Sequence, residues 1–235
     1  MYKYRKESET TYCIGTTLTI EALSFAPKQM RKVYISPKQK KDQTYEKVVS
    51  LAKKSSVPVI FNNEKIFKEV SGKDNCMVLG EFEKFSSCLD GGKNHIVLVN
   101  PSNQGNLGTI LRSCFGFYQQ DIALITPCAD PFDPKTVRAS MGALFHLRIE
   151  FFPDFPSYQA RFPEHRLHPF MLQADKLLKA ADKTGPWSLV FGNEATGLDA
   201  CFLRVGEPLL IPQNPALDSL NLDNAVSIVL YEFCR

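Results

Sequence analysis

In the first ninety residues, short apolar runs alternate with stretches whose apolar positions follow a helical period. The pattern predicts strands at 33–35, 57–61 and 76–80, a helix over 45–54 and a short helix over 63–70. Residues 81–93 lose this periodicity and contain Asp90-Gly91-Gly92, which is typical of a linker. The sequence therefore predicts a small αβ domain with its linker over residues 1–90 and a second domain over 91–235.

From residue 94 onward, strand-like runs alternate with helical patterns. Strands are predicted at 95–99, 122–126, 147–152, 167–172, 188–192 and 208–211, and helices after residue 106, from residue 134 and from residue 219. Apolar runs such as Ile96-Val97-Leu98-Val99 lack two-residue alternation, as expected when helices cover both faces of a parallel sheet. The predicted fold class is α/β with a parallel sheet.

Three segments, residues 103–112, 192–198 and 211–221, each run from the end of a predicted strand into a turn with Gly or Pro and polar side chains. Open parallel sheets bind ligands at the carboxyl ends of their strands. These segments therefore contain the candidate site residues.

In the first segment, Asn106 is a plausible helix N-cap, and the guanidinium of Arg112 could fork onto a phosphate. Each has a local alternative, because a mere cap and a surface ion pair would need no ligand. In the second, Glu194 would share a crevice with Arg112 if their two strands are neighbours. Its alternative is an exposed carboxylate in a glycine-rich connection.

The third segment leads into the predicted terminal helix. Ser219 is the expected N-cap of that helix. Asn221 would lie in its first turn, where an Asn has little local reason to occur and offers both a donor and an acceptor.

Composition narrows the class of protein. Of 235 residues, 44% are hydrophobic and 23% charged, which is ordinary for a globular chain. No apolar run approaches the ~20 residues of a membrane-spanning helix, and the amino terminus is unlike a signal peptide. Seven scattered cysteines without a Cys-x-x-Cys pair suit a reducing compartment. We expect a soluble, cytoplasmic protein.

Charge is distributed unevenly. Residues 1–93 carry 17 basic and 11 acidic side chains, whereas residues 94–235 carry 11 and 14. Nine basic and two acidic residues lie between Lys28 and Lys54. This density could neutralise several phosphates, although a solvated lysine-rich helix face would look the same.

Several chemistries lack their signatures. The sequence has no Gly-x-Gly-x-x-Gly or Gly-x-x-x-x-Gly-Lys phosphate loop and no Gly-x-Ser-x-Gly nucleophile motif. Its closest histidine pair, His165 and His168, has no cysteine or carboxylate cluster at ligand spacing. We expect no metal.

The three segments resemble, in order, the signatures of the SpoU (TrmH-like) family of RNA 2′-O-ribose methyltransferases, part of the SPOUT superfamily. The matching residues are Asn106-Leu107-Gly108, Arg112, Gly192-Asn193-Glu194, Gly197-Leu198, Ile211-Pro212, Ser219-Leu220-Asn221 and Leu230-Tyr231-Glu232, with Val137 to Ala143 resembling a further stretch of the family. The chain departs from the family pattern at Ala195, Gln213 and Leu222-Asp223, where Gly, Met and Val-Ser are usual.

This resemblance implies a trefoil knot in the carboxyl-terminal domain, a ribosomal-protein-like substrate-binding domain ahead of it, and a homodimer formed through the knotted domain. It implies S-adenosylmethionine as cofactor and a ribose 2′-hydroxyl of ribosomal or transfer RNA as acceptor, with RNA as the partner and no metal. A non-catalytic, dimeric RNA-binding protein is the alternative. Methylation of a protein or small molecule is disfavoured by the basic first domain.

The resemblance also assigns roles to individual residues. The expected catalytic residues are Arg112, Asn106, Glu194, Ser219 and Asn221. The expected cofactor-binding residues are Gly192, Ile211, Leu220, Gln173 and Ala174. The expected RNA-binding residues are Arg138, Lys28, Arg31 and Lys32. Arginine is a poor base, so Arg112 is expected to clamp phosphate and stabilise oxyanion charge rather than to accept the proton.

Overall fold

The computed structural model describes residues 2–72 and 75–235. Their contacts divide the chain into two compact units. The N-terminal unit comprises residues 1–85 with 130–146, and the C-terminal unit comprises residues 86–129 with 147–235. The N-terminal unit thus includes a segment from well beyond residue 90. Within the described ranges, no helix combines the length and apolar content needed to cross a membrane.

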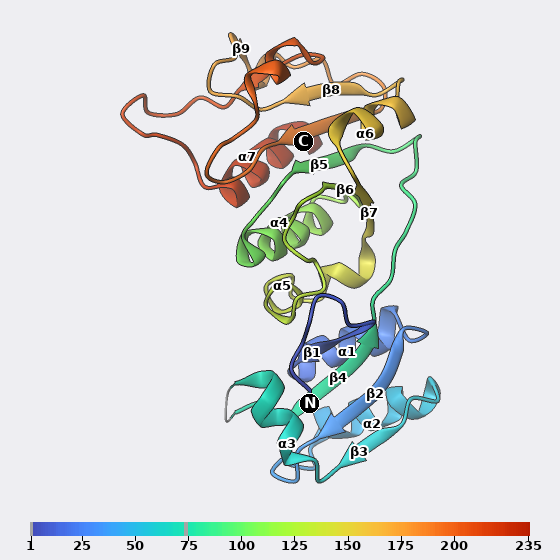
Figure 1. Ribbon diagram of the computed structural model, residues 1–235. Helices are drawn as coiled ribbons and strands as arrows, with labels where there is room; N and C mark the ends of the chain where they lie inside the picture. The colour runs from blue at the N-terminus through green and yellow to red at the C-terminus, as the bar shows by residue number, and fades with distance from the viewer. Residues whose placement is uncertain (1, 73–74) are drawn as a thin grey trace. The chain divides into compact units, whose positions relative to one another are not determined.

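The N-terminal unit is built on a four-stranded sheet in the order β1-β4-β2-β3 (Figure 1). Its strands are β1 (Thr10–Ile14), β2 (Met30–Ile35), β3 (Val59–Phe61) and β4 (Val78–Glu83). β4 runs antiparallel to both β1 and β2, whereas β3 pairs parallel to β2. The predicted linker therefore begins too early, because β4 continues to Glu83 as an extended, partly apolar strand.

Short helices complete this unit. They are α1 (Thr16–Phe25), α2 (Gln43–Lys54), α3 (Glu64–Ile66) with a π-helical turn over Phe67–Ser71, α5 (Pro134–Ala139) and a 3-10 turn over Ala143–His146. Asp42 caps α2, because its carboxylate accepts from the backbone N–H of Tyr45 at 2.9 Å. Lys53 and Lys54 in the last turn of α2 favour the carbonyl end of the helix.

The C-terminal unit contains the parallel sheet that the sequence predicts. Its strands are β5 (His95–Val99), β6 (Asp121–Ile125), β7 (Arg148–Phe152), β8 (Arg166–Pro169) and β10 (Trp187–Phe191), in the order β7-β6-β5-β10-β8. All four pairings are parallel. A two-stranded parallel ladder joins β9 (Lys176–Leu177) to β11 (Leu209–Leu210).

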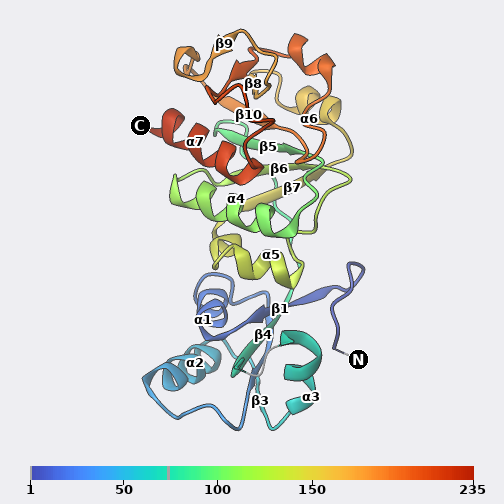
Figure 2. The same cartoon turned by 90° about the vertical axis from the view of Figure 1, so that its left-hand side faces the viewer.

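Helices cover both faces of this sheet, as the apolar runs predict. They are α4 (Gln104–Gly116), α6 (Phe155–Arg161) and α7 (Leu222–Cys234), with 3-10 turns over Leu178–Ala180 and Ala200–Arg204. The helices α4 and α7 lie side by side on one face, and α6 lies on the other (Figures 1 and 2). The hydroxyl oxygens of Ser113 and Ser227 are 2.8 Å apart between α4 and α7.

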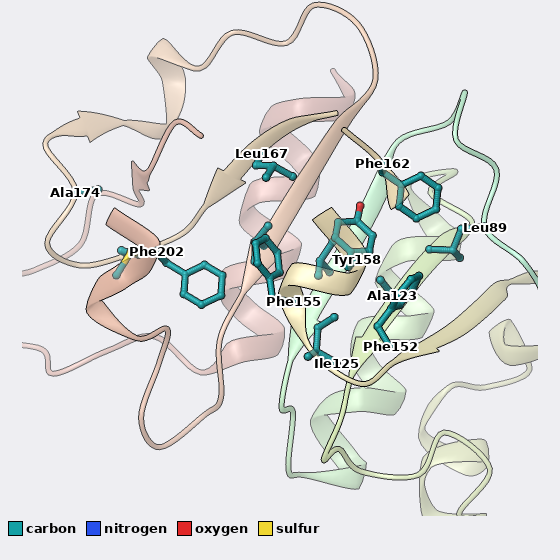
Figure 3. Packing of buried hydrophobic residues seen from close by; sticks show 13 residues of the cluster. Leu89, Ala123, Ile125, Phe152, Phe155, Tyr158, Phe162, Leu167, Ala174 and Phe202 are labelled. Carbon is teal, nitrogen blue, oxygen red and sulfur yellow. The ribbon is translucent and has the colours of Figure 1, made fainter. Parts of the chain in front are cut away.

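The α6 face of the sheet carries an apolar cluster of thirteen buried residues (Figure 3). Phe155 and Tyr158 of α6, and Phe162 directly after it, pack against sheet residues such as Val97 and Val190. Alternate residues of the same strands point to the opposite face. Strands that are apolar on both faces are what a sheet covered on both sides requires.

Candidate active site

The first two signature segments meet because their strands are neighbours. β5 pairs with β10, with Leu98 opposite Phe191, so both strands end at the same edge of the sheet. The segment around Asn106 follows β5, and the segment around Glu194 follows β10. The strands that precede Arg112 and Glu194 are therefore neighbours, as a shared crevice requires.

The carboxylate of Glu194 joins these segments. One oxygen accepts hydrogen bonds from the backbone N–H and the hydroxyl of Ser102, each at 2.9 Å. The other accepts from the backbone N–H of Asn103 at 3.1 Å and from the Asn106 side-chain amide at 3.3 Å. Glu194 therefore fastens the connection after β10 to the amino-terminal end of α4.

The environment of Glu194 favours its ionised form. Burial alone would raise the pKa of this carboxyl, but hydrogen bonds from Ser102 and Asn103 outweigh it and hold the pKa below its ordinary value. The position at the start of α4 adds a favourable helix dipole. Glu194 is consequently a fixed negative charge at neutral pH.

The turn that carries Glu194 depends on a glycine. The backbone groups of Asn193 and Gly197 bond to each other, at 3.2 and 2.9 Å, and the Asn193 side chain donates to the carbonyl of Asn100 at 2.7 Å. A Cβ atom at Gly192 would stand 2.2 Å from the carbonyl carbon of Gly197. Only glycine lets the two backbone segments approach this closely.

A cavity of about 340 Å³ opens beside this turn. The second and third signature segments line it together with residues 170–173. Its lining residues are Phe170, Met171, Leu172, Gln173, Phe191, Gly192, Asn193, Glu194, Ala195, Thr196, Gly197, Leu198, Leu210, Ile211, Gln213, Asp218, Ser219, Leu220, Leu222 and Ala225. This volume lies within the usual range of small-molecule sites, and apolar walls with a few polar groups are their usual lining.

The structure brings some of the predicted residues into the cavity and leaves others outside. Those that line it are Gly192, Ile211, Leu220 and Gln173 of the predicted cofactor set, and Glu194 and Ser219 of the predicted catalytic set. Asn106 lies next to the cavity through its bond to Glu194. Ala174 is not among the lining residues, and its side chain is buried in the apolar cluster of the sheet.

Arg112 and Asn221 also lie outside the lining of the cavity. The Arg112 side chain is exposed on α4, six residues beyond Asn106, which corresponds to about 9 Å along a helix axis. Arg112 belongs to α4, and Asn221 directly precedes the first residue of α7.

Two predicted helix caps are wrong, by three residues at α4 and by two residues at α7. α4 is capped by Asn103, whose side-chain oxygen accepts from the backbone N–H of Gly105 and Asn106 at 2.8 and 3.0 Å. This cap frees the Asn106 amide to reach Glu194. α7 begins at Leu222 with Asn221 in the N-cap position, and the Asn221 side chain makes no capping hydrogen bond. Ser219 is therefore part of the preceding loop and lines the cavity.

Three further residues hold the site together and were not predicted from the sequence: Ser102, Asn103 and Asn193. Two Asn residues three positions apart, Asn103 and Asn106, gave the only signal, since either could cap the helix. Nothing in a single sequence indicates that the Asn193 side chain bridges to the strand end at Asn100.

The four predicted RNA-binding residues all belong to the N-terminal unit. Lys28, Arg31, Lys32 and Arg138 have exposed side chains. Arg31 forms an ion pair with Glu83, so part of its charge is neutralised within the protein. The other three make no ion pair among residues 2–72 and 75–235 that would compete with a phosphate.

The closest histidine pair is divided between two environments. His165 contacts Ser188 and the carbonyl of Gly91, at 2.8 and 3.0 Å. The His168 ring lies 3.4 Å from the Glu207 carboxylate. Burial lowers the pKa of His168 below its ordinary value, so it is neutral at physiological pH.

Comparisons with known proteins agree with this arrangement. The model of the SpoU rRNA Methylase family matches residues 93–231, and a model described as RNA 2′-O ribose methyltransferase substrate binding matches residues 12–85. The chain belongs to the SpoU rRNA Methylase family.

Individual relatives of similar sequence carry the names of RNA methyltransferases. An uncharacterized tRNA/rRNA methyltransferase of Synechocystis is 34% identical over 143 residues, which cover 60% of this chain and 52% of the relative. The 23S rRNA (uridine(2479)-2′-O)-methyltransferase of Streptomyces viridochromogenes is 31% identical over 149 residues, with the same coverage of 60% and 52%. The match thus spans about half the length of these two proteins.

A solved structure extends the likeness to nearly the whole chain. An rRNA methyltransferase from Sinorhizobium meliloti, determined with AdoMet bound, superposes with a TM-score of 0.83 at 28% identity. The superposition covers 97% of this chain and 88% of that one.

Proposed function

We propose that this protein transfers a methyl group from S-adenosylmethionine to a ribose 2′-hydroxyl of ribosomal or transfer RNA. The observation that carries the proposal is the cavity at the carboxyl edge of the sheet, which two of the three signature segments line and Glu194 joins to the first. Family membership and the names of the relatives support the reaction and the RNA acceptor.

The donor set of the cavity fits this cofactor. Its described lining contains no Lys, Arg or His, which disfavours ligands whose affinity depends on phosphate. Apolar side chains such as Leu198, Leu210 and Ile211 suit a purine, and backbone groups around Gly192 and Leu220 offer donors and acceptors. When bound, S-adenosylmethionine supplies a methyl group on a cationic sulfonium.

The chain's own residues would then position the acceptor. Arg112 clamps a phosphate of the target nucleotide and stabilises charge that develops on the ribose oxygen. Asn106, held by Glu194, orients the ribose, while Ser219 and Asn221 approach from the third segment. The hydroxyl proton leaves through phosphate or water, since arginine is too weak a base to accept it.

The remaining features of the proposal concern assembly. We propose that the loops around the cavity form a trefoil knot and that the N-terminal unit binds RNA through Lys28, Arg31, Lys32 and Arg138. We also propose a homodimer formed through the C-terminal unit, supported by exposed apolar residues on α7, Ile228 and Tyr231. Sedimentation at equilibrium tests the dimer, and a monomer would contradict it. A cytoplasmic location stays a prediction.

An assay with Arg112→Ala tests the reaction. Purified protein, labelled S-adenosylmethionine and RNA from cells that lack the gene should give 2′-O-methylated RNA. Arg112→Ala should abolish transfer and leave S-adenosylmethionine binding nearly intact. The control is Arg204→Ala, an exposed arginine outside the site, which should keep full activity.

Two outcomes would contradict parts of this proposal. Full turnover by Arg112→Ala would contradict the role of that residue. A wild-type protein that binds RNA but not S-adenosylmethionine in calorimetry would support the non-catalytic RNA-binding alternative. The intact cavity and the bonded pair of Asn106 and Glu194 disfavour that alternative.

A further inference from the structure

The cavity has an unbalanced charge. Among its described lining residues, two carboxylates, Glu194 and Asp218, face no basic side chain of the same lining. A cavity with acidic groups and without basic ones favours a cationic ligand over a neutral or anionic one.

The two carboxylates differ in their hydrogen bonding within the protein. The oxygens of Glu194 accept four hydrogen bonds from Ser102, Asn103 and Asn106, so its charge is already matched by donors and by the start of a helix. Asp218 makes no hydrogen bond or ion pair within the described part of the chain. Its charge is therefore the one available to a ligand.

A turn holds Asp218 at the cavity. The Asn214 side chain accepts from the backbone N–H of Ala216 at 2.9 Å, and the Asn214 carbonyl accepts from the N–H of Leu217 at 3.0 Å. The Gln213 side chain, where the family usually has Met, donates to the carbonyl of Leu217 at 3.5 Å. The residue after this closed turn is Asp218, which is followed by two further lining residues.

We propose that Asp218 is a specificity-determining residue that distinguishes the methyl donor from its demethylated product. This inference rests on the proposed function. In that reaction the bond from sulfur to methyl breaks, sulfur keeps the electron pair, and the methyl group bonds to the ribose oxygen, whose proton is released. A cationic sulfonium thus becomes a neutral thioether. A carboxylate in the cavity holds the cation more tightly than the neutral product and so favours product release.

The size of the effect follows from the setting of Asp218. A solvent-exposed pair of opposite charges contributes up to about 1 kcal/mol, and a partly enclosed one somewhat more. We expect Asp218 to strengthen binding of the donor about threefold to tenfold relative to S-adenosylhomocysteine.

Calorimetric titration of the full chain with both nucleosides tests the inference. Asp218→Asn should weaken binding of S-adenosylmethionine about threefold to tenfold and leave the affinity for S-adenosylhomocysteine unchanged. Asp218→Lys should enlarge the loss for the donor alone. The matched control is Asp175→Asn, because Asp175 is exposed two residues beyond the lining residue Gln173 and does not itself line the cavity. It should change neither affinity.

The outcomes separate this inference from the proposed function. If the wild-type protein binds neither nucleoside, the proposed function fails. If it binds both and Asp218→Asn weakens both equally, Asp218 contacts a part that donor and product share, and the inference alone is overturned. The same holds if Asp218→Asn changes neither affinity or if Asp175→Asn reproduces its effect. Circular dichroism checks that each variant is folded.

Discussion

At the scale of single residues, Glu194 acts by positioning others rather than by exposing a reactive group. Its four hydrogen bonds all go to the connection after β5 and the first turn of α4. Asn106 reaches the site as a member of this arrangement. Its orientation therefore depends on a carboxylate that is distant in the sequence.

Replacement of Glu194 by Gln should reveal this role. The glutamine amide keeps the shape but offers one oxygen, and its NH₂ group would face N–H donors. We expect the free energy of unfolding to fall by about 1–2 kcal/mol and kcat to fall about tenfold as Asn106 loses its anchor. Urea unfolding and the methyl-transfer assay measure the two effects.

The pH dependence of stability provides a second test of the Glu194→Gln variant. Because hydrogen bonds hold the folded pKa of Glu194 below that of an unfolded glutamate, its contribution to stability is present above the unfolded pKa and is lost as pH falls through the folded value. The stability gap between wild type and Glu194→Gln should therefore close in acid. Glu164→Gln, an exposed control, should match the wild type throughout. Equal stability of Glu194→Gln and wild type at neutral pH would refute the positioning role.

At the scale of elements, a buried polar chain ties β5, α6 and β10 together near the amino ends of the strands. His95 contacts the Tyr158 hydroxyl at 2.8 Å, which lies 2.6 Å from the hydroxyl of Ser188. The second His95 nitrogen lies 2.9 Å from the carbonyl oxygen of Asp90, and His165 contacts Ser188 from the other side. These bonds attach the segment before β5 to the sheet.

Burial of His95 in these hydrogen-bonded side chains predicts that the protein loses stability in mild acid. Burial lowers the pKa of His95 to about 4, whereas an unfolded histidine titrates near 6.5. Between these two pKa values the unfolded state binds more protons than the folded state, so the free energy of unfolding decreases as pH falls. The contribution of His95 to stability is therefore complete above pH 6.5 and is lost as pH falls to about 4. The difference between the two pKa values corresponds to about 3 kcal/mol. His168, also with a lowered pKa, acts in the same direction.

Urea unfolding at several pH values checks this prediction. His95→Gln should be less stable than wild type at neutral pH but should lose less stability on acidification. Tyr158→Phe breaks the same chain without removing a titrating group, so it should lower stability and retain the wild-type slope. A wild-type slope in His95→Gln would show that the titration belongs elsewhere.

The elements that the sequence predicted well are those whose burial is uniform. The strands at 95–99 and 188–192 are continuous apolar runs, and β5 and β10 lie in the middle of a sheet covered on both faces. The helix α1 (Thr16–Phe25) was missed because its Thr and Ile residues suit strands, and α6 because it is seven residues long and begins with Phe-Pro. The two-residue ladder of β9 and β11 depends on tertiary contact and has no local signature.

The position of the candidate site could be predicted from the sequence, but its helix caps could not. Segments that follow neighbouring strands could be placed at one edge of the sheet, and six of the ten predicted catalytic and cofactor residues line the cavity. The caps could not be resolved, because Asn103 and Asn106 are chemically equivalent and only the contact with Glu194 decides which side chain caps the helix.

At the scale of the whole molecule, the chain order does not coincide with the compact units. Residues 130–146 follow β6 in the sequence but pack within the N-terminal unit. The Thr11 hydroxyl donates to the carbonyl of Phe132 at 2.6 Å. The rings of Phe82 and Phe145 lie 5.1 Å apart at an angle of 72°. The segment therefore completes the core of the N-terminal unit.

This arrangement predicts how fragments will behave. A fragment of residues 1–90 leaves Phe82 without its aromatic partner and Thr11 without its acceptor, so it should be less stable than a fragment in which residues 1–85 are joined to 130–146 by a flexible linker. An aromatic pair contributes about 0.5–1.5 kcal/mol beyond its buried area and a hydrogen bond about 1 kcal/mol, so we expect a difference of at least about 1.5 kcal/mol. Urea unfolding followed by circular dichroism measures it.

A further variant identifies the source of the difference. Phe145→Ala in the linked fragment removes the aromatic contact but keeps the hydrogen bond of Thr11. This variant should lose most of the added stability, because removal of a large buried ring leaves a cavity. Two fragments with equal unfolding midpoints would mean that the N-terminal unit has a complete core within residues 1–85. In that case residues 130–146 would add no stability to this unit, and the burial of side chains such as Val137 and Leu144 would need another explanation.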